Sequence, residues 1–71
     1  MIENNFKNIL NEAKELHQNG NLISAINEYL KLIDSHKDDP ELNFYLGTAY
    51  LQSGAYEKSI KYLEQSINNT K

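Results

Sequence analysis

The chain of 71 residues has no cysteine and no arginine, and it has only one proline and three glycines. Without cysteine, neither a disulfide nor a thiolate metal site can form, which is compatible with a reducing compartment. Its cations are seven lysines against ten acids, for a net charge of −3. Because this balance repels phosphate backbones, we expect no nucleic-acid partner.

Long apolar runs are also missing, since the longest unbroken stretches contain two or three apolar residues. A helix needs about 20 to cross a bilayer, so the sequence predicts no membrane partner and no integral membrane protein. The first residues carry an acid at Glu3, where a signal peptide would be basic, and no apolar segment follows them. We therefore expect a cytoplasmic protein.

What the chain does have is helical periodicity. Apolar residues recur at steps of three and four, which places them along one side of a helix, in four successive segments. The stripes predict helices over 2–18, 22–33, 40–53 and 56–67, followed by a polar tail to residue 71. No strand is expected.

The breaks between these segments carry turn signals. Gly20 and Gly54 follow two of the stripes, where glycine can adopt the left-handed conformation that ends a helix. Asn21 is predicted to cap the second helix, and Asp39 before Pro40 is predicted to cap the third. No linker or low-complexity segment divides the chain.

The sequence repeats itself at a spacing of 34 residues, a period typical of helix-turn-helix repeats. The superimposed pairs are Leu16 with Tyr50, Gln18 with Gln52, Gly20 with Gly54, Leu22 with Tyr56, Ala25 with Ser59, Ile26 with Ile60 and Ile33 with Ile67.

Residues 43–63 resemble the tetratricopeptide repeat, with Leu46-Gly47, Tyr50, Gly54 and Tyr56 at the signature positions. The first unit is weaker but keeps Gly20. The resemblance implies an all-α fold of two tandem helical hairpins, a short right-handed α-solenoid of four helices. We expect one domain over 1–71, with repeat one at about 6–39 and repeat two at about 40–71.

Small residues are expected where the helices of a hairpin approach closely, at Ala13 and Gly47, while Tyr50, Tyr56 and Leu63 fill the space between successive helices. Departures from the family pattern include Asn43, which stands where the family favours tryptophan.

No arrangement typical of a catalyst or a metal site is visible. His17 and His36 lack metal-ligand spacing, and acid pairs such as Glu12 with Glu15 are expected on a solvated face. We predict no enzyme activity, no cofactor and no metal.

The resemblance implies a concave groove lined by the first helix of each hairpin, which would bind a peptide or protein partner. The residues expected to face that partner are Leu10, Lys14, His17, Gln18, Phe44, Tyr45, Thr48, Leu51 and Gln52. Aromatic side chains can anchor a ligand and amides can pair with an extended backbone. The alternative is that Leu10, Phe44 and Leu51 simply pack.

Two repeats without a capping helix are expected to leave part of the Ile60, Leu63 and Ile67 side in water, and such a patch marks an interface. Two explanations compete: the chain forms a homodimer through this face, or it is one piece of a longer repeat array. The predicted function is a protein-interaction scaffold, and the alternative is a structural oligomerisation unit without a separate ligand.

Overall fold

The computed structural model describes residues 2–68, with side chains from residue 5 onward. Within that range the chain forms four helices and no strand: α1 (Ile2–Gln18), α2 (Leu22–Ile33), α3 (Pro40–Ser53) and α4 (Tyr56–Asn68). The predicted all-α architecture and the four helical segments are confirmed. Asn68, which was predicted as the first residue of the polar tail, belongs to α4. The rest of that tail, 69–71, and the side chain of Ile2 lie outside the described residues.

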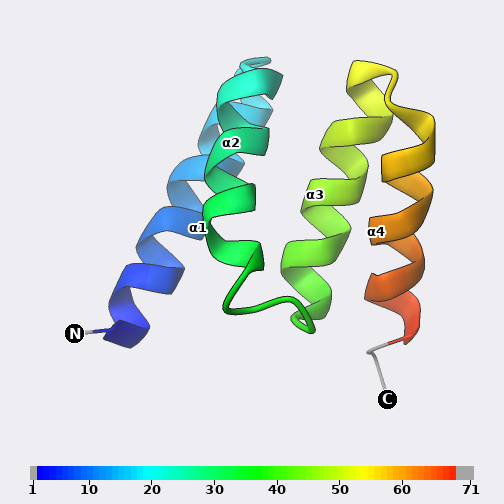
Figure 1. Cartoon of the computed structure of the whole chain (residues 1–71). Coiled ribbons are helices and arrows are strands. Elements are labelled where there is room, and N and C mark those ends of the chain that lie inside the picture. The colour runs from blue at the N-terminus through cyan, green and yellow to red at the C-terminus, as the bar shows by residue number, and fades with distance from the viewer. Residues whose placement is uncertain (1, 69–71) are drawn as a thin grey trace.

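The helices form two antiparallel hairpins that stand side by side (Figure 1). Within each hairpin the helices pack on each other, and the hairpins meet through α2 and α3, with a smaller contact between α1 and α3. The shortest dimension of the chain is 16 Å, which fits two layers of helices whose axes are about 8–10 Å apart. The result is a short solenoid.

Turn chemistry explains where the helices end. Gly54 has a φ of +91°, and the amide of Ala55 bonds back to the Tyr50 carbonyl at 2.9 Å. Gly20 has a φ of +87° at the corresponding turn. Both conformations lie in the left-handed region, which glycine enters without a side-chain clash.

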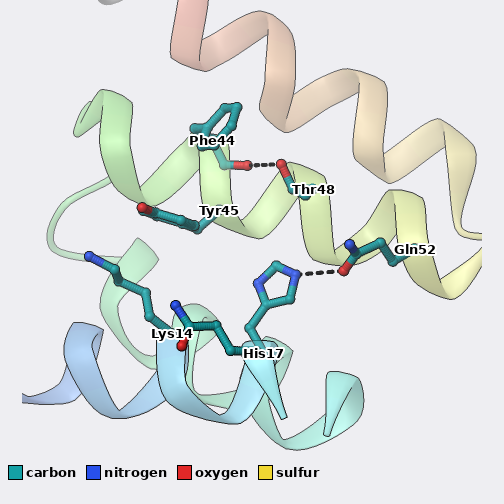
Figure 2. A pocket seen from close by; sticks show the side chains of 7 residues that line it. Lys14, His17, Phe44, Tyr45, Thr48 and Gln52 are labelled. Atoms are coloured by element: carbon teal, nitrogen blue, oxygen red, sulfur yellow. Dashed lines mark hydrogen bonds between the residues drawn. The ribbon is translucent and has the colours of Figure 1, made fainter. Parts of the chain in front are cut away.

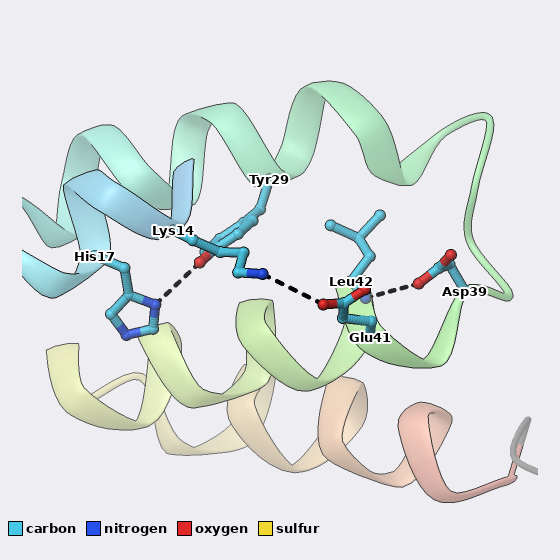
Figure 3. Close-up of polar contacts among 6 residues, drawn as sticks. All are labelled: Lys14, His17, Tyr29, Asp39, Glu41 and Leu42. Atoms are coloured by element: carbon cyan, nitrogen blue, oxygen red, sulfur yellow. Dashed lines mark hydrogen bonds and ion pairs between the residues drawn. The ribbon is translucent and has the colours of Figure 1, made fainter. Parts of the chain in front are cut away.

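The two predicted N-caps have different outcomes. Asp39 accepts a hydrogen bond from the Leu42 amide at 2.9 Å, which confirms it as the cap of α3 (Figure 3). The prediction for Asn21 is wrong, because its side chain makes no capping hydrogen bond. Its backbone carbonyl accepts from the Ala25 amide at 2.9 Å, which is the first main-chain bond of α2.

The core lies between the hairpins and within each of them. Its buried apolar members are Leu10, Ala13, Ala25, Tyr29, Leu32, Leu42, Leu46, Ala49 and Tyr50. Members come from α1, α2 and α3, whereas the buried residue of α4 is Ser59. α4 therefore packs against the rest of the described chain on one side only, through α3.

The helices α3 and α4 approach each other closely at Gly47, as predicted for a small residue. A Cβ atom built on Gly47 would lie 2.7 Å from Leu63 Cγ and 3.0 Å from the Leu63 backbone nitrogen. Leu63 thus fills the space that glycine leaves, as expected. The prediction for Tyr56 is wrong: its side chain is 63% exposed, because no helix within residues 2–68 covers that side of α4.

Asn43 has a structural role of its own. It is 1% exposed, and its amide nitrogen donates to the carbonyls of Lys37 and Asp39 at 2.9 and 2.8 Å. These bonds tie the connection between α2 and α3 to the first turn of α3. The side-chain amide has two N–H donors and can bond both carbonyls, whereas a tryptophan at this position would have a single N–H.

Candidate functional site

A groove of about 350 Å³ lies between α1 and α3. The helices contribute to it unequally: α1 supplies Lys14, His17 and Gln18, and α3 supplies Phe44, Tyr45, Thr48 and Gln52 (Figure 2). Their spacing of three and four residues along each helix puts these side chains on neighbouring faces. The structure therefore brings together seven of the nine side chains predicted to face a partner.

The other two predicted residues lie elsewhere. Leu10 is only 4% exposed and belongs to the core, so the expectation that it faces the groove is wrong. Leu51 is 48% exposed but is not among the residues that line the groove.

His17 connects three helices at one end of the groove. Its Nε2 lies 2.6 Å from Gln52 Oε1 on α3, and its Nδ1 lies 3.1 Å from the Tyr29 hydroxyl on α2 (Figures 2 and 3). Because the amide oxygen can only accept, Nε2 carries the proton in this arrangement, and Nδ1 accepts from the phenol. The imidazole therefore positions groove residues from both hairpins.

Tyr29 is a buried residue of α2 that supports the groove without lining it, and it was not among the residues predicted to form the site. Burial raises the pKa of its phenol to about 12, and the neighbouring Tyr45 phenol adds a smaller effect in the same direction. The hydroxyl thus stays protonated at neutral pH and remains a donor to His17. Spacing alone could not reveal this role, since an aromatic in a helical stripe ordinarily signals packing.

Aromatic rings form the apolar part of the groove. Tyr45 stacks on the buried Tyr29 ring with centroids 6.3 Å apart and planes 14° from parallel. Phe44 meets Tyr45 edge to face at 5.4 Å and is 50% exposed. Because Tyr45 packs on the buried Tyr29 ring, it gives the groove an apolar surface that is held in place.

Lys14 supplies the positive charge. Its Nζ lies 3.4 Å from Glu41 Oε2 and 4.9 Å from the centre of the Tyr45 ring (Figure 3). The contact with Glu41, at the start of α3, crosses from one hairpin to the other. Since Glu41 is more exposed than Lys14, this pair adds little stability but holds the ammonium beside the ring.

The groove thus offers two aromatic rings in edge-to-face contact, an imidazole, one paired ammonium group, two amides and the hydroxyls of Tyr45 and Thr48. These groups can bind apolar, anionic and amide-bearing ligands. Among the described residues, no group of three or more histidine, cysteine, aspartate or glutamate side chains is placed to hold a metal ion. No helix within residues 2–68 is long and apolar enough to cross a membrane.

The side predicted for self-association is divided by the structure. Ile60 is 56% exposed and Ile67 is 72% exposed, as expected for an outer face. Leu63 is half-buried against Gly47 and belongs to the packing of α3 on α4. A charge at Leu63 would therefore damage the fold, and Ile60 is the better position for testing this face.

Comparison with protein families agrees with the helical hairpins. The model described as TPR repeat matches residues 13–54, and the model described as tetratricopeptide repeat matches residues 40–70. No curated protein and no solved structure matches the chain.

The chain belongs to the tetratricopeptide repeat family, with tandem repeats. Repeats of this family generally mediate protein–protein interactions, and they are typically non-enzymatic.

Proposed function

We propose that this protein is an interaction module that binds a peptide segment of another protein in the groove between α1 and α3. The observation that carries the proposal is the convergence of seven polar and aromatic side chains from two hairpins on one hollow. Such mixed surfaces, with a few aromatic anchors and polar groups beside them, are typical of binding sites.

The chemistry of the groove favours an extended ligand with an apolar anchor. An aliphatic or aromatic side chain can rest on Tyr45 and Phe44, while the amides of Gln18 and Gln52 can pair with backbone groups of the ligand. Lys14 is already paired with Glu41, so an acidic ligand group has to compete for it. The apolar anchor is therefore the main source of affinity.

The test starts from a phage-displayed library of random peptides selected on the wild-type chain. Affinities of the selected peptides are then measured by isothermal titration calorimetry against Lys14→Ala and Tyr45→Ala. Each substitution is expected to weaken binding about tenfold, the usual effect at a contributing interface residue. Lys31→Ala is the matched control, because Lys31 is an exposed, ion-paired lysine on α2 away from the groove.

Nuclear magnetic resonance gives an independent readout. Amide shifts caused by a selected peptide should concentrate on α1 and α3. Shifts confined to α4, or equal affinity for the wild type and both groove variants, would contradict the proposal.

A structural self-association unit is the second candidate, and the exposed Ile60 side chain favours it. In that case the mass measured by light scattering should double at high concentration and fall on dilution. Ile60→Asp should then leave a monomer at every concentration.

A further inference from the structure

The groove between α1 and α3 contains two glutamine side chains, and the structure holds only one of them in a fixed orientation. The amide oxygen of Gln52 lies 2.6 Å from His17 Nε2. Gln18 occupies the equivalent place thirty-four residues earlier, and its side chain makes no hydrogen bond to the described residues. A free amide can turn either its oxygen or its nitrogen toward a ligand. The two amides therefore differ in what they offer to a partner.

The hydrogen bonds that hold Gln52 begin at the hydroxyl of Tyr29, a fully buried residue of α2. Within the described residues, the partner of this hydroxyl is His17 Nδ1, at 3.1 Å (Figure 3). Burial raises the pKa of the phenol to about 12, so the hydroxyl keeps its hydrogen at neutral pH. Because an unpaired donor is costly in a buried place, the Tyr29 hydroxyl donates to Nδ1.

The tautomer of His17 carries this direction across the imidazole ring. Since Nδ1 accepts from the phenol, the hydrogen of the neutral ring is on Nε2, which donates. In the side-chain amide of Gln52 the oxygen is the atom that accepts, so the oxygen faces His17. The amide nitrogen is therefore turned away from the imidazole (Figure 2).

The opposite direction of the same bridge is unfavourable. With its hydrogen on Nδ1, the His17 ring would donate to the Tyr29 oxygen, and Gln52 would turn its nitrogen toward Nε2. The hydroxyl hydrogen of Tyr29 would then have no acceptor among the described residues. Water does not reach it, because the side chain is 0% exposed and Tyr45 stacks on the ring. Burial of Tyr29 thus selects one direction for the whole bridge.

In this direction the bridge presents a hydrogen-bond donor to the groove. Gln52 is exposed and lines the groove, and its amide nitrogen has no acceptor within residues 5–68. A ligand group beside this nitrogen has to accept, since a ligand N–H would face another N–H. The cation of the groove, Lys14, is already paired with Glu41, so an anion gains no free counter-charge there. These conditions favour a neutral acceptor, such as a backbone carbonyl.

The bridge is a feature of these particular hairpins and not of the repeated pattern. Thirty-four residues after His17 and Tyr29 the chain has Leu51 and Leu63, whose side chains form no hydrogen bonds. The equivalent glutamines, Gln18 and Gln52, are present in both repeats. The direction of Gln52 therefore comes from two residues of the first hairpin, one of which does not line the groove.

We propose that Tyr29 and His17 make Gln52 a one-way hydrogen-bond donor, so that the groove selects an extended peptide with a backbone carbonyl beside the Gln52 amide. The inference rests on the proposed binding of a peptide in this groove. An extended segment has carbonyls available for such a bond, whereas most carbonyls of a helix are paired within the helix. Gln52 contacts the ligand in this arrangement, and His17 and Tyr29 are positioning residues.

The probe is the tightest-binding peptide of the library selection, prepared with single changes in its backbone. At each peptide bond in turn, an ester removes the N–H and keeps the carbonyl, and an (E)-alkene removes both. Isothermal titration calorimetry on the full chain measures the affinities. At the bond beside Gln52, the ester should retain most of the affinity and the alkene should bind about tenfold more weakly than the ester.

A charged variant identifies that bond. In Gln52→Glu the carboxylate still accepts from His17 Nε2, but it presents an oxygen in place of the amide nitrogen. The tenfold difference between ester and alkene should therefore disappear at this bond. Gln18→Glu is the matched control, because it adds the same charge to the same groove. It should change the ester and alkene affinities at this bond by the same factor and leave their ratio unchanged.

Tyr29→Phe examines where the direction comes from. Tyr29 is fully buried, so it cannot touch a ligand, and phenylalanine keeps its aromatic ring. Without the hydroxyl, His17 can adopt either tautomer and the Gln52 amide can turn either way. The ratio between ester and alkene affinities should then fall to about threefold or less. Circular dichroism checks that the variant is folded at the assay temperature.

Nuclear magnetic resonance of the free chain gives a measurement that needs no ligand. Nitrogen-15 correlation spectra of the imidazole distinguish the two tautomers, and His36→Gln removes the signals of the other histidine. At mildly alkaline pH, His17 should carry its hydrogen on Nε2 in this background. Adding Tyr29→Phe should give a mixture of both tautomers. A hydrogen on Nδ1 with the Tyr29 hydroxyl present would overturn the proposed direction.

The outcomes separate this inference from the proposed function. A peptide that binds in the groove with equal ester and alkene affinities at every bond would overturn the one-way donor and leave peptide binding intact. The same holds for a peptide that loses affinity on amidation of its C-terminus but at no alkene, since a carboxylate is then the group recognised. If the selection yields no binder, or if amide shifts are confined to α4, both proposals fail.

Discussion

The close approach of α3 and α4 at Gly47 leads to a prediction against the intrinsic preference of the helix. Replacing glycine by alanine in the interior of a helix ordinarily stabilises it by about 1 kcal/mol. At Gly47 the new Cβ would lie 2.7 Å from Leu63 Cγ and 2.9 Å from Leu63 Cδ2. It would also lie 3.0 Å from the Leu63 backbone nitrogen, so rotation of the side chain alone cannot relieve the contact.

Overpacking of this kind costs about 1–3 kcal/mol, which exceeds the gain in helix propensity. We therefore expect Gly47→Ala to lower the free energy of unfolding by about 1 kcal/mol, measured by urea denaturation followed by circular dichroism. In a chain of this size the corresponding change in Tm is a decrease of about 4–8 °C.

Two comparisons isolate the cause. Asn11→Ala, at an exposed position of α1, should show the propensity gain alone and stabilise by a few tenths of a kcal/mol. In a Leu63→Ala background, Gly47→Ala should cost about 1 kcal/mol less than it does in the wild type, since the side-chain overlap is gone. If Gly47→Ala stabilises the wild-type chain as much as an exposed substitution does, the two helices do not pack as described.

Other polar contacts give further expectations. Asp39→Ala should destabilise the chain by about 1 kcal/mol in the same urea assay, because the Leu42 amide loses its capping acceptor, and Asp39→Asn should retain most of the stability. Tyr29→Phe should also cost about 1 kcal/mol, since His17 Nδ1 loses its donor; an unchanged unfolding midpoint would refute that contact. The folded-state pKa of Tyr29 is raised from 10.0 to about 12, so its contribution to stability is complete below pH 10 and is lost as the pH rises through 12. The free energy of unfolding should therefore fall more steeply between pH 10 and 12 in the wild type than in Tyr29→Phe. Identical pH profiles of stability would contradict this assignment.

The sequence by itself determined the helices, their ends and the repeat. These features depend on neighbours close in the chain: apolar spacing sets each helix, Gly20 and Gly54 end two of them, and Asp39 starts the third. The role of Gly47 as a small residue could also be predicted, because its place in the repeat indicates a close contact between helices. Local patterns were misleading at Asn21, where the backbone alone completes the turn.

Only the tertiary structure decided which side chains are available for binding. Leu10 and Phe44 occupy equivalent places in the two repeats, yet one is buried and the other is half exposed. The bridge from His17 to Tyr29 and Gln52 likewise joins residues from three helices. The apolar spacing shows which face of a helix is apolar, but the exposure of that face depends on whether another helix packs on it. In this chain α3 packs on the first hairpin, and no helix within residues 2–68 packs on the equivalent face of the second.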